Sequence, residues 1–275
     1  MTLGVPDQIE QRIQSAERLR LFLDYDGTLA DFAPTPEHVD PQPEVVELLA
    51  ELADRRDIRL AVISGRRLGH VERLVGGLEG RSGPSILLAG TYGVELRLPD
   101  AERVDRVPYH EIRPVLDTIK PRWRRFIDDG DGFFLEDKDW ALAIHAKDAP
   151  EDKAAELLDE ARHLAEAVVG EAASPGRFRI LGGHKFLEIG PALAHKGRTV
   201  AYLLDRYPWV GALPVYVGDD DKDEEAFGVV HAHGGVAVRV CEATCETRAD
   251  ARLSSPEDVR RWLRRIVDRR GAAAP

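Results

Sequence analysis

Cysteine is scarce in this chain, and its scarcity excludes one class of protein at once. Only two of the 275 residues are cysteines, Cys241 and Cys245. Two cysteines cannot form the disulfide framework of a small secreted domain. No matching set of histidines or further cysteines indicates zinc, so we expect both thiols to be reduced and structural.

Long apolar runs are missing as well. No stretch approaches the roughly 20 consecutive apolar residues that a membrane-spanning helix needs, so we expect no membrane partner. The first seven residues lack a basic segment followed by an apolar block, which is the pattern of a secretory signal. A cytoplasmic location is therefore our expectation.

Positive charge is in deficit. The chain has 38 lysines and arginines against 49 aspartates and glutamates, for a formal net charge of −11. Such a balance argues against a nucleic-acid partner, because phosphate backbones attract basic surfaces. An acidic protein that binds an anionic substrate must concentrate its positive charge locally, through a metal ion or a lysine.

What the chain does contain is a series of buried strands separated by helical patterns. Residues 19–23, 58–63, 85–90, 214–217 and 235–240 are apolar runs of strand length. Helical crossovers between such strands predict an α/β fold with a parallel sheet covered on both faces. In these sheets the chemistry lies beyond the carboxyl ends of the strands.

A different pattern interrupts this series. Between about residues 107 and 185, a helix and two strand-like runs are followed by a second helix and two more strand-like runs. This order suits a small α+β unit with an open antiparallel sheet, inserted into the parallel fold. We therefore predict a first core segment at 1–106, an inserted cap domain at 107–189 and a second core segment at 190–275.

Polar side chains follow the predicted strands. Asp24, Asp26 and Thr28 come directly after the first strand, and two carboxylates at the end of a dry strand repel each other unless a cation shares them. Oxygen ligands favour a hard divalent ion, above all Mg²⁺. A structural alternative, in which each polar group only caps a helix or faces solvent, is open for any one motif taken alone.

Taken together, the four motifs resemble those of the haloacid dehalogenase superfamily of phosphatases. They occur in the expected order, as Asp-Tyr-Asp-Gly-Thr at 24–28, Ile-Ser-Gly-Arg at 63–66, Lys-Gly at 196–197 and Gly-Asp-Asp-Asp-Lys-Asp at 218–223. The resemblance implies a Rossmann-like parallel sheet with an inserted cap, which is the haloacid dehalogenase fold. It also implies phosphate transfer to a carboxylate, which divides one difficult displacement into two easier ones.

The resemblance assigns a role to each motif residue. Asp24 would be the nucleophile, and Asp26 would protonate the leaving oxygen and then activate water. Mg²⁺ would be held by Asp24, the backbone carbonyl of Asp26, Asp219 and Asp223. Lys196 would supply positive charge to the transferring phosphate. Phosphate oxygens would be bound by Thr28, Ser64, Gly65 and Lys196.

Within the superfamily the chain is similar to the trehalose-6-phosphate phosphatases over residues 19–267. The likeness is carried by Gly-Thr-Tyr-Gly-Val-Glu at 90–95, Leu-Glu-Asp-Lys at 135–138 and Phe-Leu-Glu-Ile-Gly-Pro at 186–191, together with the first and last motifs. The resemblance implies a small-molecule sugar phosphate as the substrate, and we expect a monomer. Residues implied to contact the substrate are Arg66, Glu136, Lys138, Lys147 and Glu188.

Four positions depart from the family pattern. Lys222 stands where the family has threonine, Ala146 and Lys147 replace a tyrosine and an arginine, and Gly190 replaces an arginine. These changes leave the hydrolytic residues in place but bear on the sugar. A sibling enzyme that acts on glucosyl- or mannosyl-3-phosphoglycerate or on sucrose 6-phosphate is the first alternative.

Two further alternatives belong to other classes. A phospho-acceptor signalling module also uses a strand-end aspartate, an acidic pair and a lysine. It needs neither a second carboxylate at the position of Asp26 nor an inserted segment, and both are present here. A non-catalytic regulatory subunit is disfavoured because no residue of the hydrolytic motifs has been lost.

Overall fold

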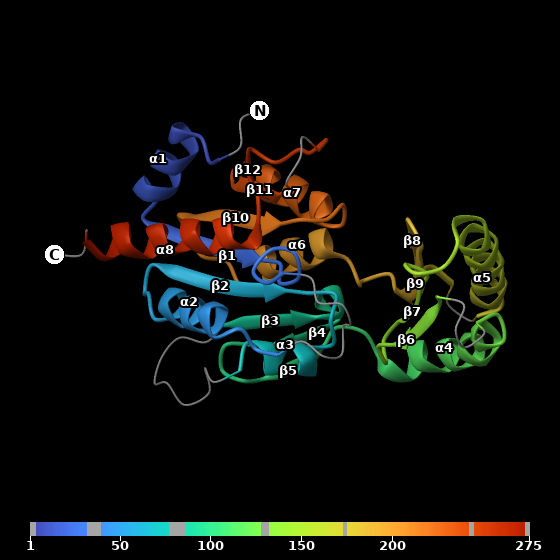
Figure 1. Cartoon of the computed structure of the whole chain (residues 1–275). Helices are drawn as coiled ribbons and strands as arrows, with labels where there is room; N and C mark the ends of the chain where they lie inside the picture. Colours follow the sequence, from blue (N-terminus) through green and yellow to red (C-terminus); the bar gives the residue numbers. More distant parts are fainter. Residues whose placement is uncertain are drawn as a thin grey trace. The chain divides into compact units, whose positions relative to one another are not determined.

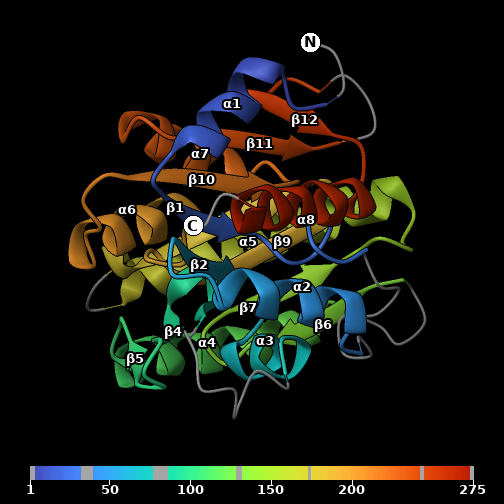
Figure 2. The same cartoon turned by 90° about the vertical axis from the view of Figure 1, so that its left-hand side faces the viewer.

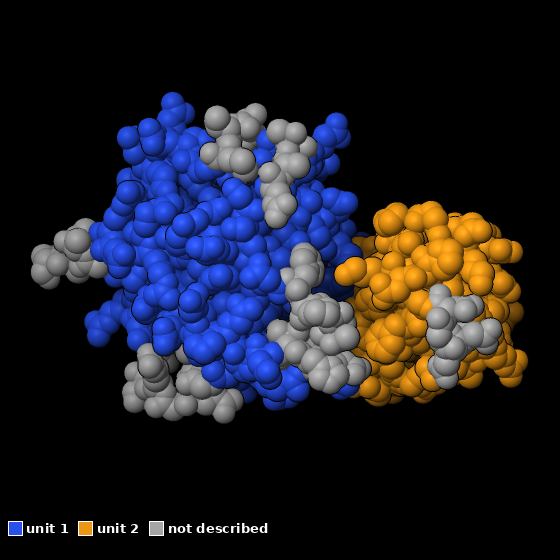
Figure 3. Space-filling view, viewed as in Figure 1, with its two compact units in different colours: residues 1–104, 195–275 blue, residues 105–194 orange. Residues whose placement is uncertain are grey.

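The structure, a computed structural model, describes residues 4–31, 40–76, 86–127, 132–172, 175–241 and 245–272. The chain divides into two compact units, coloured separately in Figure 3. Unit 1 combines Met1–Val104 with His195–Pro275, and unit 2 is Asp105–Ala194. Unit 2 is therefore an insertion within the sequence of unit 1.

Unit 1 contains an eight-stranded sheet in the order β12-β11-β10-β1-β2-β3-β4-β5 (Figure 1). All pairings from β12 to β3 are parallel, and β4 turns back antiparallel to β3. The strands are β1 (Arg18–Leu23), β2 (Ile58–Ile63), β3 (Leu87–Gly90), β4 (Glu95–Arg97), β5 (Arg103–Asp105), β10 (Ala212–Gly218), β11 (Val236–Val240) and β12 (Ala251–Leu253).

Helices cover both faces of this sheet, as the views in Figures 1 and 2 show. The helices on one face are α1 (Asp7–Ser15), α2 (Pro43–Ala53), α3 (Leu68–Leu74) and α8 (Pro256–Ala272). Those on the other are α6 (Lys196–Arg206) and α7 (Asp223–Ala232). Because both faces are covered, the inner strands are buried over most of their length. Strand β1 alternates arginine and leucine in its first four residues and is apolar from Leu21 to its end, and β10 is largely apolar.

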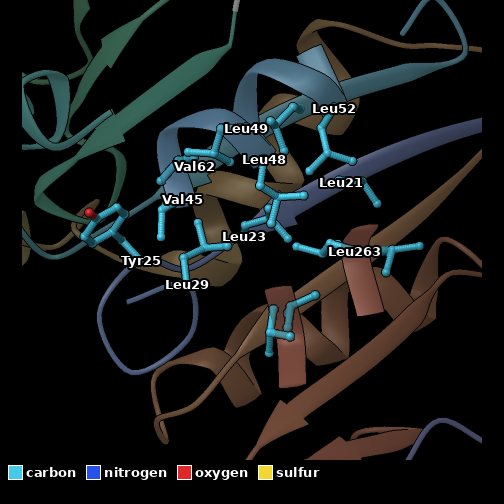
Figure 4. Close-up of a cluster of buried hydrophobic side chains, with 14 of the residues drawn as sticks. Leu21, Leu23, Tyr25, Leu29, Val45, Leu48, Leu49, Leu52, Val62 and Leu263 are labelled. Carbon is cyan, nitrogen blue, oxygen red and sulfur yellow. The ribbon is translucent and has the colours of Figure 1, made fainter. Parts of the chain in front are cut away.

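The larger apolar core lies between β1 and the helices α2 and α8 (Figure 4). Leu21 and Leu23 point from β1 into this core, where Leu48 and Leu263 are also fully buried. The opposite side of β1 contributes Phe22 to the second core, under α6 and α7. Strand β1 is thus fixed from both sides, which holds the residues that follow it in a defined position.

Unit 2 contains a four-stranded antiparallel sheet in the order β6-β7-β9-β8. Its elements are α4 (Tyr109–Arg124), β6 (Phe134–Asp137), β7 (Leu142–His145), α5 (Glu151–Glu171), β8 (Phe178–Gly183) and β9 (Phe186–Pro191). The two helices pack on each other, and the indole of Trp123 donates a hydrogen bond to the carbonyl of Ala161 across them. The predicted α/β class, with a mostly parallel core sheet and a separate α+β unit, is confirmed.

Three short strands escaped the sequence analysis. Strands β4, β5 and β12 have three residues each, too few to show a period in the sequence. Cys241 and Cys245 are free cysteines on either side of residues 242–244, which lie outside the described residues. Within the described residues, no helix combines the length and the apolar composition that crossing a bilayer requires.

Candidate functional site

The parallel register brings the ends of β1 and β10 together. Leu23 pairs with Val217, and the backbone N–H of Asp24 donates to the carbonyl of Val217 at 3.0 Å. Asp24 and Asp219 therefore leave the same edge of the sheet from neighbouring strands. The side chain of Asp24 is buried, with the residue only 4% exposed. This edge is where the sequence predicted the chemistry to lie.

A tight turn follows Asp24. The carbonyl of Tyr25 accepts hydrogen bonds from the N–H groups of Leu29 and Ala30, at 2.9 and 3.0 Å. Gly27 sits at φ +74°, a left-handed conformation that favours glycine. The turn brings Thr28 back so that its Oγ1 lies 3.3 Å from a carboxylate oxygen of Asp24 and 3.3 Å from one of Asp219.

Lys196 joins the carboxylates from the start of α6. Its Nζ lies 2.7 Å from Oδ1 of Asp223, 3.0 Å from Oδ1 of Asp24 and 3.8 Å from Oδ1 of Asp220. The lysine is 2% exposed, so these interactions take place out of water. Burial alone would lower the pKa of Lys196, but the charges of Asp223 and Asp24 outweigh it and raise the pKa well above the usual value.

Asp223 organises the loop that leads into α7. Its Oδ2 accepts the backbone N–H groups of Asp219 and Asp220, at 3.1 and 3.0 Å. Its Oδ1 accepts the hydroxyl of Tyr216 at 2.7 Å in addition to Lys196. Tyr216 could not be predicted from the sequence, because its apolar neighbours in β10 give no signal that this one side chain reaches the aspartate seven residues later.

Gly218 is required at the end of β10 by close packing. A Cβ at this position would lie 2.2 Å from Cγ of Asp223, with no room for either group to remain in place. We expect Gly218→Ala to displace Asp223 and to weaken the binding of a divalent cation by about tenfold or more, as loss of a supporting carboxylate does in metal sites. Titration calorimetry with Mg²⁺ measures this change.

Gly69→Ala is the matched control, since a Cβ at Gly69 meets no atom within 4 Å. It should give the same titration with Mg²⁺ as the unaltered chain. Equal affinity in both variants would show that the packing of Asp223 against Gly218 does not support the site.

Charge is unbalanced in this cluster of Asp24, Asp219, Asp223 and Lys196. The three carboxylates each offer an oxygen within 4.8 Å of the others, against one ammonium group. Burial raises the pKa of Asp24 well above its usual range, and that of Asp219 to about 6, the carboxylate of Asp223 adding to both effects. Oxygen donors with surplus negative charge in a buried place fit a hard divalent cation.

The raised pKa of Asp219 predicts how the stability of the metal-free protein depends on pH. An acid with a higher pKa in the folded than in the unfolded state stabilises the fold below the unfolded pKa of about 4. That stabilisation is lost as the pH rises through the folded pKa, about 6. We therefore expect Asp219→Asn to raise the melting temperature of metal-free protein more at pH 7 than at pH 5. Thermal unfolding in EDTA tests this, and an equal rise at both pH values would contradict it.

Ser64 and Gly65 follow β2, the other neighbour of β1. Oγ of the buried Ser64 accepts the backbone N–H of Arg66 at 3.1 Å, and a Cβ at Gly65 would lie 2.7 Å from the ring of Tyr92. Arg66 reaches back to the first motif, where its Nε and Nη2 each donate to Asp26 at 2.7 Å. Both carboxylate oxygens of Asp26 are thus engaged by Arg66.

Tyr92 connects the second and fourth motifs, a link that the sequence analysis missed. It lies in a left-handed turn at φ 54°, its N–H donates to the carbonyl of Ser64, and it is 6% exposed. Nζ of Lys222 donates to its hydroxyl at 3.0 Å and lies 5.1 Å from the centre of its ring. Lys222, one of the four residues that depart from the family pattern, therefore contacts the turn beside Gly65.

In unit 2, three of the predicted residues meet on the sheet. Nζ of Lys138 lies 2.7 Å from Oε2 of Glu188 and 3.7 Å from Oε2 of Glu136. His145, a residue without a predicted role, lies 2.9 Å from the same oxygen of Glu136. Lys147 is exposed on the turn that follows β7.

The chain is similar to known proteins over most of its length. It matches the family model described as Trehalose-phosphatase over residues 22–258. The trehalose-phosphate phosphatase of Mycobacterium tuberculosis is 32% identical over 259 residues, which are 92% of this chain and 62% of the relative. A probable trehalose-phosphate phosphatase of Sinorhizobium fredii is 31% identical over 243 residues, covering 87% of this chain and 84% of the relative.

A solved structure supports the fold independently. The C-terminal domain of Candida albicans trehalose-6-phosphate phosphatase superposes with a TM-score of 0.79 at 19% identity, covering 98% of this chain and 99% of that one. The chain spans about three fifths of the length of the mycobacterial relative. The buried acid and lysine cluster thus occurs in a chain with the sequence pattern and the fold of these proteins.

Proposed function

The chain belongs to the trehalose-phosphatase family, and we propose that it is a Mg²⁺-dependent phosphatase that converts trehalose 6-phosphate to trehalose and phosphate. The observation that carries the proposal is the convergence of Asp24, Asp219, Asp223 and Lys196 at one edge of the sheet. Each residue there has a use in phosphate transfer. The identity of the sugar in the substrate is inferred from membership of the family.

Asp24 is the nucleophile. A carboxylate oxygen of Asp24 attacks phosphorus, and the bond between phosphorus and the sugar oxygen breaks as the aspartyl phosphate forms. Asp26 gives a proton to the departing sugar oxygen and later takes one from the water that attacks the aspartyl phosphate. Inorganic phosphate leaves, and the carboxylate of Asp24 is restored.

Mg²⁺ would be held by the carboxylates of Asp24 and Asp219 and the backbone carbonyl of Asp26. When bound, the ion neutralises charge between the nucleophile and the phosphate. Asp223, whose oxygens already accept four hydrogen bonds, holds the loop of Asp219 in place beside the ion. Lys196 supplies the one positive charge that the cluster contains without the metal.

The pair formed by Asp26 and Arg66 must open during the reaction. Each oxygen of Asp26 accepts a hydrogen bond from Arg66, so the carboxyl group is held toward the guanidinium until the pair opens. Arg66 is then available for a phosphate or sugar oxygen, which is the role proposed for it in substrate binding. Thr28, Ser64 and Gly65 complete the phosphate-binding set.

The sugar is bound by unit 2. Glu136 and Glu188 accept hydroxyl groups, and Lys138, fixed between them, donates to a ring or hydroxyl oxygen. Lys147 contributes a charge from the exposed turn after β7.

The experiment that tests the function is phosphate release, with and without Mg²⁺, from four substrates: trehalose 6-phosphate, sucrose 6-phosphate, glucosyl-3-phosphoglycerate and glucose 6-phosphate. We expect trehalose 6-phosphate to have the highest kcat/KM. A higher value for another sugar phosphate would keep the chemistry and correct the substrate. Absence of Mg²⁺-dependent release from all four would refute the proposal.

A further inference from the structure

One face of the sheet in unit 2 carries a row of rings. Phe134 of β6 pairs with His145 of β7, and His145 pairs with Phe186 of β9. Residues that are directly opposite in antiparallel strands point to the same side of the sheet, so the three rings share one face. The ring centres of Phe134 and His145 are 6.0 Å apart, and those of His145 and Phe186 are 5.3 Å apart. We call these three residues the aromatic row.

This row faces away from the apolar core of unit 2. The residues that alternate with it, Leu135, Ile144 and Leu187, are buried on the other face of the sheet. Phe134 by contrast is 45% exposed and is one of few large apolar side chains, among the described residues, that face solvent. An exposed phenylalanine next to a second ring and an imidazole, on the polar face of a sheet, needs an explanation other than core packing.

The acidic residues stand directly beside the aromatic row. Glu136 and Glu188 are two positions further along β6 and β9 and point to the same face, and Ala143 lies between them in register. Lys138 and Gly190 come two positions further again. Since two residues of a strand span roughly 6.6 Å, the face runs over roughly 13 Å from rings through carboxylates to lysine.

Small residues lie between the longer side chains of this face. Ala143 separates the two glutamates, and Gly190 stands beside Ala141, where a Cβ at Gly190 would lie 3.0 Å from the Cβ of Ala141. The family's arginine at position 190 has no space here without displacement of Ala141.

We propose that the aromatic row is a stacking platform for a pyranose ring, and that it selects substrates whose leaving group carries a second sugar ring. The inference rests on the proposed function, since it names the part of the substrate that this face binds. The C–H groups of a pyranose present an apolar face that packs on aromatic rings, and its hydroxyl groups point outward at the rim. Glu136 and Glu188 are one strand step away from the rings and accept those hydroxyls.

The charges of this face favour a carbohydrate over an apolar occupant. A peptide or lipid that covered the rings would bring apolar surface against Glu136 and Glu188, which would then lose water without gaining a hydrogen-bond donor. A sugar satisfies both groups at once, because it is apolar on its ring face and rich in donors at its edge. His145 links the aromatic row to the glutamates, because it belongs to the row and contacts Oε2 of Glu136.

The test compares the same substitution at two successive residues of the full chain. Phe134→Leu removes a ring of the row, and Phe133→Leu removes a ring that packs on the other side, against Ala146, Ala149 and Ala154. For each variant, kcat/KM is measured with trehalose 6-phosphate and with p-nitrophenyl phosphate, which has no second sugar. The ratio of kcat/KM for trehalose 6-phosphate to kcat/KM for p-nitrophenyl phosphate measures the contribution of the sugar. A general loss of active protein lowers both values equally and leaves the ratio unchanged.

Phe134→Leu should lower this ratio about tenfold, equal to about 1.4 kcal/mol, mainly through a higher KM. Phe133→Leu should leave the ratio within about twofold. Phe134→Tyr should restore it, because the ring returns. Equal ratios in Phe134→Leu and Phe133→Leu would overturn the platform and leave the phosphatase proposal intact.

Binding of trehalose itself separates the platform from the reaction. Saturation-transfer NMR with unphosphorylated trehalose needs no turnover. It therefore detects binding of the sugar to the aromatic row even if trehalose 6-phosphate is not the substrate. We expect transfer to the sugar C–H protons in the unaltered chain and in Phe133→Leu, and a strong reduction in Phe134→Leu. Absence of transfer in the unaltered chain, or the same transfer in both variants, would overturn the inference.

Discussion

Asp24→Asn is expected to abolish phosphate release, with a fall in kcat of more than about a thousandfold. The amide has the shape of the carboxylate but is too weak a nucleophile to form the covalent phosphate on which both halves of the reaction depend. The loss should be the same for trehalose 6-phosphate and for p-nitrophenyl phosphate, because both must pass through Asp24. Steady-state phosphate release measures the effect.

The fold of Asp24→Asn should survive. Burial raises the pKa of Asp24 well above its usual range, so the ionised side chain is unfavourable where it stands and its removal relieves repulsion from Asp223 and Asp219. We therefore expect the metal-free variant to melt at the same temperature as the unaltered chain or higher. Activity above about a tenth of normal in this variant would show that another residue is the nucleophile.

Removal of divalent cations should have the second largest effect, a fall in kcat of at least about a hundredfold. Three carboxylates, of which Asp24 and Asp223 are buried, cluster together with one lysine, Lys196, and in the absence of a divalent ion their surplus charge repels the incoming phosphate. Addition of excess Mg²⁺ after EDTA should restore the rate in full. Phosphate release across a Mg²⁺ titration gives both the loss and the recovery.

Asp219→Asn separates this effect from general damage by the chelator. The variant keeps the hydrogen-bonding shape of residue 219 but offers the ion one anionic ligand fewer, so the Mg²⁺ concentration for half-maximal rate should rise by about tenfold or more. Asp221→Asn is the control, since Asp221 is in the same loop and its side chain is fully exposed. Unchanged turnover in EDTA would contradict a metal-dependent reaction.

The positions of the site residues along the chain were largely predictable, because strand ends can be seen in the sequence. The apolar run before Asp24 and the one before Gly218 predict two strands of one parallel sheet, and parallel strands deliver their carboxyl ends to one edge; that the two strands are neighbours is seen only in the structure. That is why Asp24 and Asp219 could be expected to meet although they are far apart in the chain. The roles of Glu136, Lys138 and Glu188 came from family resemblance, and their proximity followed only from the register of β6, β7 and β9.

The contacts that escaped prediction depend on where side chains turn after the strands end. Tyr216 reaches Asp223 because α7 folds back over the end of β10, and nothing in an apolar strand marks one tyrosine as a hydrogen-bond donor. Arg66 reaches Asp26 across two loops, although the sequence suggests only a substrate contact for this arginine. Lys222 contacts Tyr92 through a left-handed turn in which Thr91 and Tyr92 have positive φ as well as Gly93, and a sequence gives no signal for this conformation at non-glycine residues.

The pair of Asp26 and Arg66 has a consequence for the order of events. Its two hydrogen bonds of 2.7 Å hold the carboxyl group that serves as acid and base in the proposed reaction, so a substrate that binds Arg66 competes with Asp26 for it. A substrate phosphate or sugar oxygen that draws Arg66 away would free Asp26 at the moment when it is needed. The two residues are thus placed to link substrate binding with proton transfer.

The most direct measurement of the central claim is to trap the covalent phosphate. The full chain with Mg²⁺ is mixed with trehalose 6-phosphate labelled with ³²P, quenched in acid within milliseconds and digested for peptide mapping. The label should appear on the peptide that contains Asp24 and should be absent from Asp24→Asn. Label on a different peptide, or phosphate release with no protein-bound label at any quench time, would contradict transfer to Asp24.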